Sequence, residues 1–289
     1  MQADLSSMRA GEFRAPNPSG FHTVRYLEHG ARDAARTVVC VHGLTRNGRD
    51  FDPLAGALAA AGFRVVCPDI VGRGRSDRLA DPAAYNYGQY QQDMVALIAH
   101  LGVETVDWVG TSMGGLIGML LAVRPGTPID RLVVNDIGPF LPKAALARLA
   151  QYVGLDPVFH DRAQGETYLR QVFAPFGRLT DADWQAMAEH SLVPGGGGFR
   201  LAYDPAIRQG LLAAQDKDVD LWPVWDAIRV PTLLLWGKRS DLLTGDLVEA
   251  MLKRGPKPTL VGFDDVGHAP PMRSAAQIAP VVEWLSRRV

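Results

Sequence analysis

The stretch around Ser112 limits what this chain can fold into more than any other. Residues 106–109 form a short apolar run that is typical of a buried strand, whereas residues 116–123 are apolar on every side, as in a buried helix. The turn between them has a Gly-x-Ser-x-Gly pattern made of Gly110, Ser112 and Gly114. Side chains at the glycine positions would collide with the strand and the helix. The turn therefore strains the serine backbone and lifts its hydroxyl clear of the sheet, at the positive end of the helix.

Apolar strand-like runs alternate with helical patterns on both sides of this turn. We expect strands at 37–41, 64–69, 106–109, 129–136, 230–236 and 259–263. We expect helices at 53–61, 87–101 and 246–253, and another that begins near Ser274. Such alternation predicts a mostly parallel sheet that is covered by helices on both faces. Residues 21–29 suit an edge strand, and residues 1–16 are expected to form a flexible arm.

The alternation stops between residues 139 and 226. This block indicates several short helices, one of them opened by Pro142, and the four glycines at 195–198 are expected to be a flexible joint. Many of its residues are aromatic, and while most must form the block's own core, we expect some to face the site beneath it. We therefore predict a core domain made of residues 1–138 and 227–289, interrupted by a helical cap at 139–226.

Ligands of parallel sheets bind at the carboxyl ends of the strands, which is where Ser112 lies. A serine hydroxyl is a weak nucleophile and needs a histidine base that an acid holds in place. Of the seven histidines, His268 is set in a Gly-His-Ala-Pro loop after the last strand, so we take it as the base. Asp241 lies in a Gly-x-x-Ser-Asp turn after a buried strand and is the favoured acid. Asp136, which ends the preceding strand, is the alternative acid.

Five short motifs resemble those of the α/β-hydrolase fold with a helical cap. They are His42-Gly43, Asp69 to Ser76, Gly110 to Gly115, Ser240-Asp241 and Gly267-His268. The resemblance spans nearly the whole chain, and the order Ser112, Asp241, His268 is that of the family. It implies an α/β fold with a mostly parallel, doubly wound, eight-stranded sheet and an inserted helical cap.

The same resemblance implies the groups that surround the reaction centre. The backbone N–H groups of Leu44 and Met113 would form an oxyanion hole, which stabilises the negative charge that develops on a carbonyl oxygen. His42 would brace its loop rather than act as a base. Asp69, Arg73 and Arg75 would have structural roles in the neighbouring loop.

These features predict a serine hydrolase that cleaves carboxylic esters of small to medium, rather apolar substrates through an acyl-Ser112 intermediate. The expected partner is a small-molecule ester or a related carbonyl compound, and no metal or organic cofactor is expected. One alternative is hydrolysis of carbon–carbon bonds in diketo acids, for which Arg46 or Arg200 could bind the substrate carboxylate. Another alternative is a ligand-binding relative of the family that has no catalytic activity.

Charge and composition argue against other classes of partner. The formal net charge is −1 at pH 7 and there is no basic run, so we do not expect a nucleic-acid ligand. No apolar stretch reaches the roughly 18 residues that span a bilayer, so no membrane partner is expected. Cys40 and Cys67 lie in apolar runs and should be reduced and buried, and residues 1–16 lack the apolar core of a secretory signal. We expect a cytoplasmic monomer or homodimer.

Overall fold

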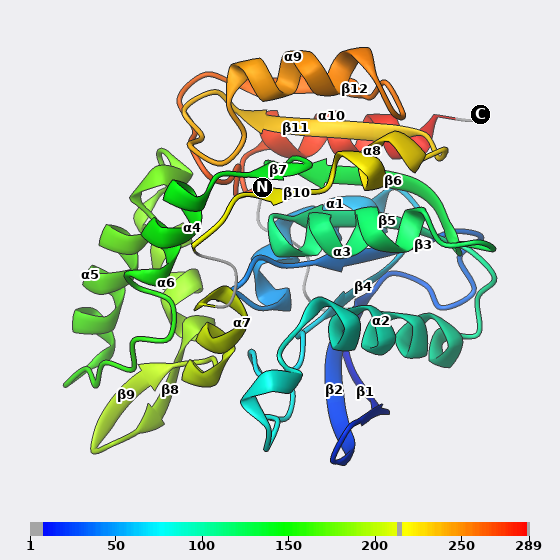
Figure 1. Ribbon diagram of the computed structural model, residues 1–289. Coiled ribbons are helices and arrows are strands. Elements are labelled where there is room, and N and C mark those ends of the chain that lie inside the picture. Colours follow the sequence, from blue (N-terminus) through cyan, green and yellow to red (C-terminus); the bar gives the residue numbers. More distant parts are fainter. Residues whose placement is uncertain (1–7, 213–215, 288–289) are drawn as a thin grey trace.

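The computed structural model describes residues 8–212 and 216–287 and is organised around one eight-stranded sheet (Figure 1). The strand order across the sheet is β1-β2-β4-β3-β5-β6-β11-β12. The strands are β1 (Arg9–Asn17), β2 (Gly20–His29), β3 (Thr37–Val41), β4 (Arg64–Pro68), β5 (Val106–Thr111), β6 (Ile129–Asn135), β11 (Thr232–Gly237) and β12 (Thr259–Phe263). Strands β4, β3, β5, β6, β11 and β12 run parallel to one another, and β2 is antiparallel to both of its neighbours. The predicted fold class, a mostly parallel α/β sheet, is confirmed.

The first edge of the sheet differs from the expectation. A flexible arm over residues 1–16 is wrong for the part that the structure describes, because residues 9–17 form the edge strand β1. This strand pairs along its whole length with β2, which is therefore an inner strand rather than an edge. Only Phe13 and Ala15 of β1 are buried. Two inward-facing apolar residues among polar neighbours are too weak a pattern to identify a strand from sequence.

Helices cover both faces of the sheet. Helices α1 (Asp52–Ala60) and α10 (Ala275–Ser286) pack on one face, and α2 (Tyr87–Leu101), α3 (Met113–Ala122) and α9 (Gly245–Lys253) pack on the other. Successive side chains of β3 point to opposite faces, so that Val38 and Cys40 pack with α1 and α10, whereas Val39 and Val41 pack with α2 and α3. Both faces are apolar, which explains the unbroken hydrophobic run of this strand. Cys40 and Cys67 are free thiols and buried, as predicted.

The helix predicted at 87–101 is α2, which has the same bounds. The side-chain oxygen of Asn86 accepts the backbone N–H of Gln89 at 3.1 Å and caps its first turn. Gly102 ends the helix with a φ of 67°, a conformation that favours glycine. These local signals lie next to the helix in the sequence, which is why its ends could be predicted.

The segment between β6 and β11 forms a group of short elements. They are β7 (Phe140–Leu141), α4 (Lys143–Ala150), α5 (Arg162–Val172), α6 (Asp181–Ser191), β8 (Leu192–Gly195), β9 (Gly198–Leu201), α7 (Arg208–Leu212), β10 (Val219–Asp220) and α8 (Trp222–Ala227). Figure 1 shows α4, α5, α6 and the β8–β9 hairpin gathered beside the sheet. Strands β7 and β10 pair with each other, so the two ends of the insertion lie side by side.

Helix α8 packs against the core through Trp225. Its Trp225 is fully buried, and the indole N–H donates to the carbonyl of Arg254, just after α9, at 3.2 Å. We therefore propose that the cap begins near residue 139, as expected, and ends near Asp220 rather than at residue 226.

The four glycines at 195–198 do not form the expected flexible joint. They connect the antiparallel strands β8 and β9 in a tight hairpin. Gly196 and Gly197 have φ values of 65° and 82°, which residues with side chains rarely adopt, so the turn itself requires glycine. A Cβ atom at Gly198 would lie 2.1 Å from the carbonyl oxygen of Phe159, which pairs beside β9.

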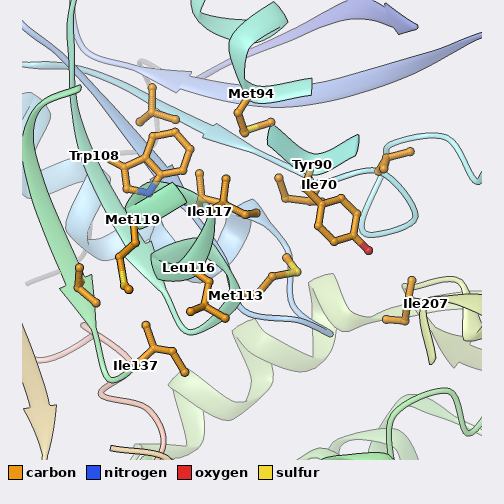
Figure 2. Packing of buried hydrophobic residues seen from close by; sticks show 14 of the residues in the cluster. Ile70, Tyr90, Met94, Trp108, Met113, Leu116, Ile117, Met119, Ile137 and Ile207 are labelled. Carbon is orange, nitrogen blue, oxygen red and sulfur yellow. The ribbon is translucent and has the colours of Figure 1, made fainter. Parts of the chain in front are cut away.

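Helix α3 lies close against β5, and the position of Ser112 depends on this contact. Figure 2 shows the ring of Trp108, from β5, packed near Ile117 of α3. The indole N–H of Trp108 donates to the carbonyl of Gly114 at 2.9 Å. A Cβ atom at Gly118 would lie 2.4 Å from Trp108 Nε1 and 2.9 Å from a methyl carbon of Leu132. The close approach of the helix therefore requires glycine at position 118.

We predict that Gly118→Ala lowers the free energy of unfolding by about 1–3 kcal/mol, because its methyl group overpacks a fully buried tryptophan. The matched control is Gly245→Ala, since Gly245 is exposed and a Cβ there would be 3.8 Å from the nearest atoms of Trp236. The control should leave stability unchanged or raise it by up to about 1 kcal/mol. Urea unfolding followed by circular dichroism measures both variants, and equal stabilities would contradict the packing described.

Candidate active site

Ser112 stands at the sharp turn between β5 and α3. Its backbone has a φ of 51° and a ψ of −112°, the strained conformation that the Gly-x-Ser-x-Gly pattern predicts. A Cβ atom at Gly110 would lie 2.2 Å from the carbonyl oxygen of Gly114, and one at Gly114 would lie 2.0 Å from that of Val41. The Ser112 N–H donates to the carbonyl of Asn135 at 2.9 Å, which ties the turn to the neighbouring strand β6.

His268 connects Ser112 to a buried carboxylate. Its Nε2 lies 2.9 Å from Ser112 Oγ, and its Nδ1 lies 2.9 Å from Asp136 Oδ2. Because an ionised carboxylate only accepts hydrogen bonds, Nδ1 carries the proton and Nε2 is free to accept the serine hydroxyl. Asp136 is 0% exposed, and its other oxygen accepts the N–H of Gly237 at 2.7 Å. The three side chains therefore have the arrangement of a nucleophile, a base and an orienting acid.

The preference for Asp241 over Asp136 as the partner of His268 is wrong in this structure. The Asp241 side chain is 49% exposed, and its two carboxylate oxygens accept from Arg148 of α4 at 2.5 and 2.9 Å. The backbone N–H of Gly237, at the end of β11, is bound by Asp136. Four residues later the chain has reached the surface, where Asp241 is solvated and paired with the cap.

The position of Asp136 follows from strand pairing. Strands β5 and β6 are adjacent and parallel, with Thr111 opposite Asn135. The residues that follow, Ser112 and Asp136, therefore leave the sheet side by side. Asp136 has a φ of 55°, a left-handed conformation that aspartate adopts more readily than most residues. The sequence shows only that Asp136 directly follows a buried strand. It does not show that this strand pairs with β5, which is what places Asp136 beside Ser112.

The two predicted oxyanion residues lie close to one buried arginine. Met113 is the first residue of α3, so its N–H has no acceptor within the helix. Leu44 lies in the loop after β3 and lines the same cavity as Ser112. Arg73 Nε donates to the Leu44 carbonyl at 2.9 Å, and Arg73 Nη2 lies 3.6 Å from the sulfur of Met113. The structural role expected of Arg73 thus includes holding the loop that contains Leu44.

His42 braces this loop from within, as the resemblance implies. The N–H of Ile70 donates to His42 Nε2 at 2.9 Å, so Nδ1 carries the proton and donates to the Gly43 carbonyl at 2.7 Å. Burial lowers the pKa of His42 to about 4. A protonated imidazole cannot accept a hydrogen bond, so charging His42 would break the contact with Ile70.

The carboxylate of Asp69 holds two neighbouring chain segments by accepting hydrogen bonds from their backbone N–H groups. Its carboxylate oxygens accept the N–H of Gly48 at 2.8 Å and the N–H of Arg75 at 2.9 Å. The side chain of Arg75 adds an ion pair to the same carboxylate at 3.5 Å. These contacts agree with the structural role expected of Asp69.

Ser112 and His268 line a cavity of about 80 Å³ between the core and the cap. The cap contributes aromatic side chains to its lining, namely Tyr152, Phe173 and Phe176. A second cavity, of about 360 Å³, is lined mostly by leucine and tyrosine side chains. Leu44 lines both cavities. Aromatic side chains of the cap therefore face the cavity that contains Ser112, as expected from the aromatic content of the cap, and arginine side chains line the same cavity.

The two arginines considered for a substrate carboxylate are already bound to carboxylates of the protein. Arg46 donates to both carboxylate oxygens of Asp50 at 2.8 and 2.5 Å, and to the hydroxyl of Ser191 at 2.9 Å. Arg200 lies 3.1 Å from Asp156, and within the described chain it is not among the residues that line the cavity. These two residues therefore give no support to the carbon–carbon hydrolase alternative.

The family model for the alpha/beta hydrolase family matches residues 38–281. The chain belongs to this family. It is 44% identical over 283 residues to a 3-hydroxybutyrate-oligomer hydrolase of Cupriavidus necator, which covers 95% of this chain and 96% of that protein. A solved alpha/beta hydrolase from Novosphingobium aromaticivorans superimposes with a TM-score of 0.86 at 33% identity, covering 98% of this chain and 99% of that one. A protein from Rickettsia typhi superimposes with a TM-score of 0.90 at 30% identity, covering both chains fully.

Two further findings concern residues 8–212 and 216–287. Every helix in these ranges is too short or too polar to cross a membrane. In the same ranges, no group of three or more His, Cys, Asp or Glu side chains is placed to hold a metal ion.

We predict that Asp136→Asn lowers kcat for ester hydrolysis by about 10³- to 10⁴-fold, because an amide favours the wrong tautomer of His268 and does not stabilise its charged form. The comparison is Asp241→Asn, which should keep kcat within about threefold of the wild type. Steady-state kinetics with p-nitrophenyl acetate measure both variants. A larger loss in Asp241→Asn than in Asp136→Asn would contradict the arrangement described here.

We predict that acid removes the contribution of neutral His42 to stability. The pKa of His42 is about 4 in the fold and near 6.5 when unfolded, so between these values the unfolded chain binds more protons and falling pH favours unfolding. From pH 7 to pH 5 the loss is about 2 kcal/mol. The variant His42→Gln has no imidazole to protonate. The difference in unfolding free energy between wild type and variant should therefore be about 2 kcal/mol smaller at pH 5 than at pH 7. Urea unfolding at the two pH values tests this, and a constant difference would refute it.

Proposed function

We propose that this protein is a serine hydrolase that cleaves ester bonds in short 3-hydroxyalkanoate oligomers, with 3-hydroxybutyrate oligomers as the expected substrates. The observation that carries the proposal is the chain of contacts from Ser112 through His268 to Asp136, with 2.9 Å at each step. The substrate class rests on the similarity to the 3-hydroxybutyrate-oligomer hydrolase along 95% of this chain. The short aliphatic repeat of such an oligomer suits a cavity with an aromatic lining.

The first half of the proposed reaction forms an acyl-enzyme. Ser112 Oγ attacks the ester carbonyl carbon, and the hydroxyl proton passes to His268 Nε2. The carbonyl oxygen becomes negatively charged, and the N–H groups of Met113 and Leu44 would stabilise it. Each such donor typically contributes about 3 kcal/mol to lowering the barrier. When the ester C–O bond breaks, His268 gives its proton to the leaving oxygen, and one product departs as an alcohol.

The second half releases the acid. A water molecule attacks the acyl carbon and passes a proton to His268 Nε2. The bond between Ser112 Oγ and the acyl carbon then breaks, the proton returns to Ser112, and the carboxylic acid leaves and ionises. Asp136 keeps its hydrogen bond to Nδ1 throughout, which fixes the ring and stabilises its transient positive charge.

We predict that Ser112→Ala lowers kcat for the 3-hydroxybutyrate dimer by about 10⁴-fold or more. Product formation is measured by chromatography of 3-hydroxybutyrate. The matched control is Ser19→Ala, because Ser19 is exposed in the turn between β1 and β2, and this variant should keep wild-type rates. A fluorophosphonate should label the wild type and the control on Ser112, but not Ser112→Ala. Undiminished turnover by Ser112→Ala would refute the serine mechanism.

A further inference from the structure

Three arginines line the cavity that contains Ser112, and their surroundings differ. They are Arg46, Arg148 and Arg273. The side chain of Arg46 is 5% exposed and is bound to Asp50 and Ser191. The side chain of Arg273 is 10% exposed and donates to Asp183 at 2.9 Å. A ligand that displaced Asp50 or Asp183 would leave that carboxylate, which is only 23% or 26% exposed, without its counter-charge, so these two arginines are not free to bind a ligand.

Arg148 differs because its ion pair is exposed. It lies on helix α4 of the cap, its side chain is 38% exposed, and that of its partner Asp241 is 49% exposed. Water can solvate Asp241 when the pair separates, and exposed pairs of this kind contribute little to stability. A ligand carboxylate can therefore replace Asp241 on Arg148 without leaving a buried charge behind.

The geometry of the pair shows what Arg148 can bind. Its Nε and Nη2 atoms donate to the two oxygens of the Asp241 carboxylate at 2.5 and 2.9 Å. This two-pronged arrangement is the one that a guanidinium offers to any carboxylate. In the structure, Asp241 of the core accepts both of these hydrogen bonds, where the cap meets the loop after β11.

The proposed substrate carries one matching group. A linear oligomer of a hydroxy acid is neutral along its ester chain, and at neutral pH it has a single charge, on the carboxylate at one end. Arg148 lines the same cavity as Ser112, and the cap aromatics lie around it. A carboxylate held at Arg148 would orient the oligomer relative to the reactive serine.

We propose that Arg148 is a specificity-determining residue, which binds the terminal carboxylate of the oligomer, and that Asp241 occupies this position until substrate replaces it. This inference rests on the proposed function. It assigns a role to Asp241 that differs from that of a catalytic acid, because Asp241 competes with the substrate carboxylate.

The test compares the free acid of the 3-hydroxybutyrate dimer with its methyl ester, which lacks the charge. Arg148→Gln should raise KM for the acid by about 10- to 100-fold, with kcat changed by less than about threefold, and should leave KM for the methyl ester unchanged. Arg148→Lys should restore part of the loss, because it keeps the charge but not the two-pronged geometry. Asp241→Asn should lower KM for the acid alone, because the competing carboxylate is gone.

The matched control is Arg239→Gln. Arg239 forms a more exposed pair with Asp265 at 2.5 Å, with both side chains 68% exposed, and in the described chain it is not among the residues that line the cavity. This variant should keep wild-type KM values for both substrates. Parallel changes for acid and methyl ester in Arg148→Gln, or an unchanged KM for the acid, would overturn the proposal. If Arg148→Gln does not fold, Asp241→Asn decides, because an unchanged or raised KM for the acid contradicts competition. Wild-type enzyme that hydrolyses neither dimer would instead refute the proposed function.

Discussion

The buried carboxylate of Asp136 is the group on which the geometry of the site depends. It has no access to water, so each of its oxygens needs a partner within the protein. One oxygen accepts the N–H of Gly237 at the end of β11, and the other binds Nδ1 of His268. These two bonds fix the imidazole so that its other nitrogen lies at Ser112. Neighbouring positions of β5, β6 and β11 in the sheet are what bring these groups within reach of one another.

The other side of the site depends on buried polar groups of a different kind. His42 is kept neutral by burial, and its two ring nitrogens connect the loop after β3 with the chain after β4. Arg73 is 1% exposed, and its guanidinium binds the carbonyl of Leu44 beside Met113. Fully satisfied polar groups in a low-dielectric interior hold a loop in one conformation. The loop that would receive the oxyanion is therefore held in place before substrate arrives.

The two acids between which the sequence leaves a choice occupy opposite environments. Asp136 is enclosed by the ends of β6 and β11 and binds Nδ1 of His268, whereas Asp241 is exposed and pairs with the cap through Arg148. Burial suits an acid that must hold one geometry throughout a reaction. Exposure suits an acid whose partner is to be exchanged, because water stabilises it during the exchange. In our proposal, the ion pair between Arg148 of the cap and Asp241 of the core is the contact that the carboxylate of the substrate replaces.

Much of this molecule could be predicted because the relevant signals are local. The apolar runs, the Asn86 cap and the Gly102 stop predict strands and α2, and the glycines around Ser112 predict its strained turn. Weak or ambiguous local patterns failed: β1 has two buried apolar side chains, and the glycines at 195–198 specify a hairpin rather than a joint. The sequence by itself predicted the parallel strands, helix α2 and the pairing of Ser112 with His268, which we propose as nucleophile and base. Only the tertiary structure decided between Asp136 and Asp241, because both follow buried strands and the choice depends on which strand lies beside β5 and which carboxylate is enclosed there.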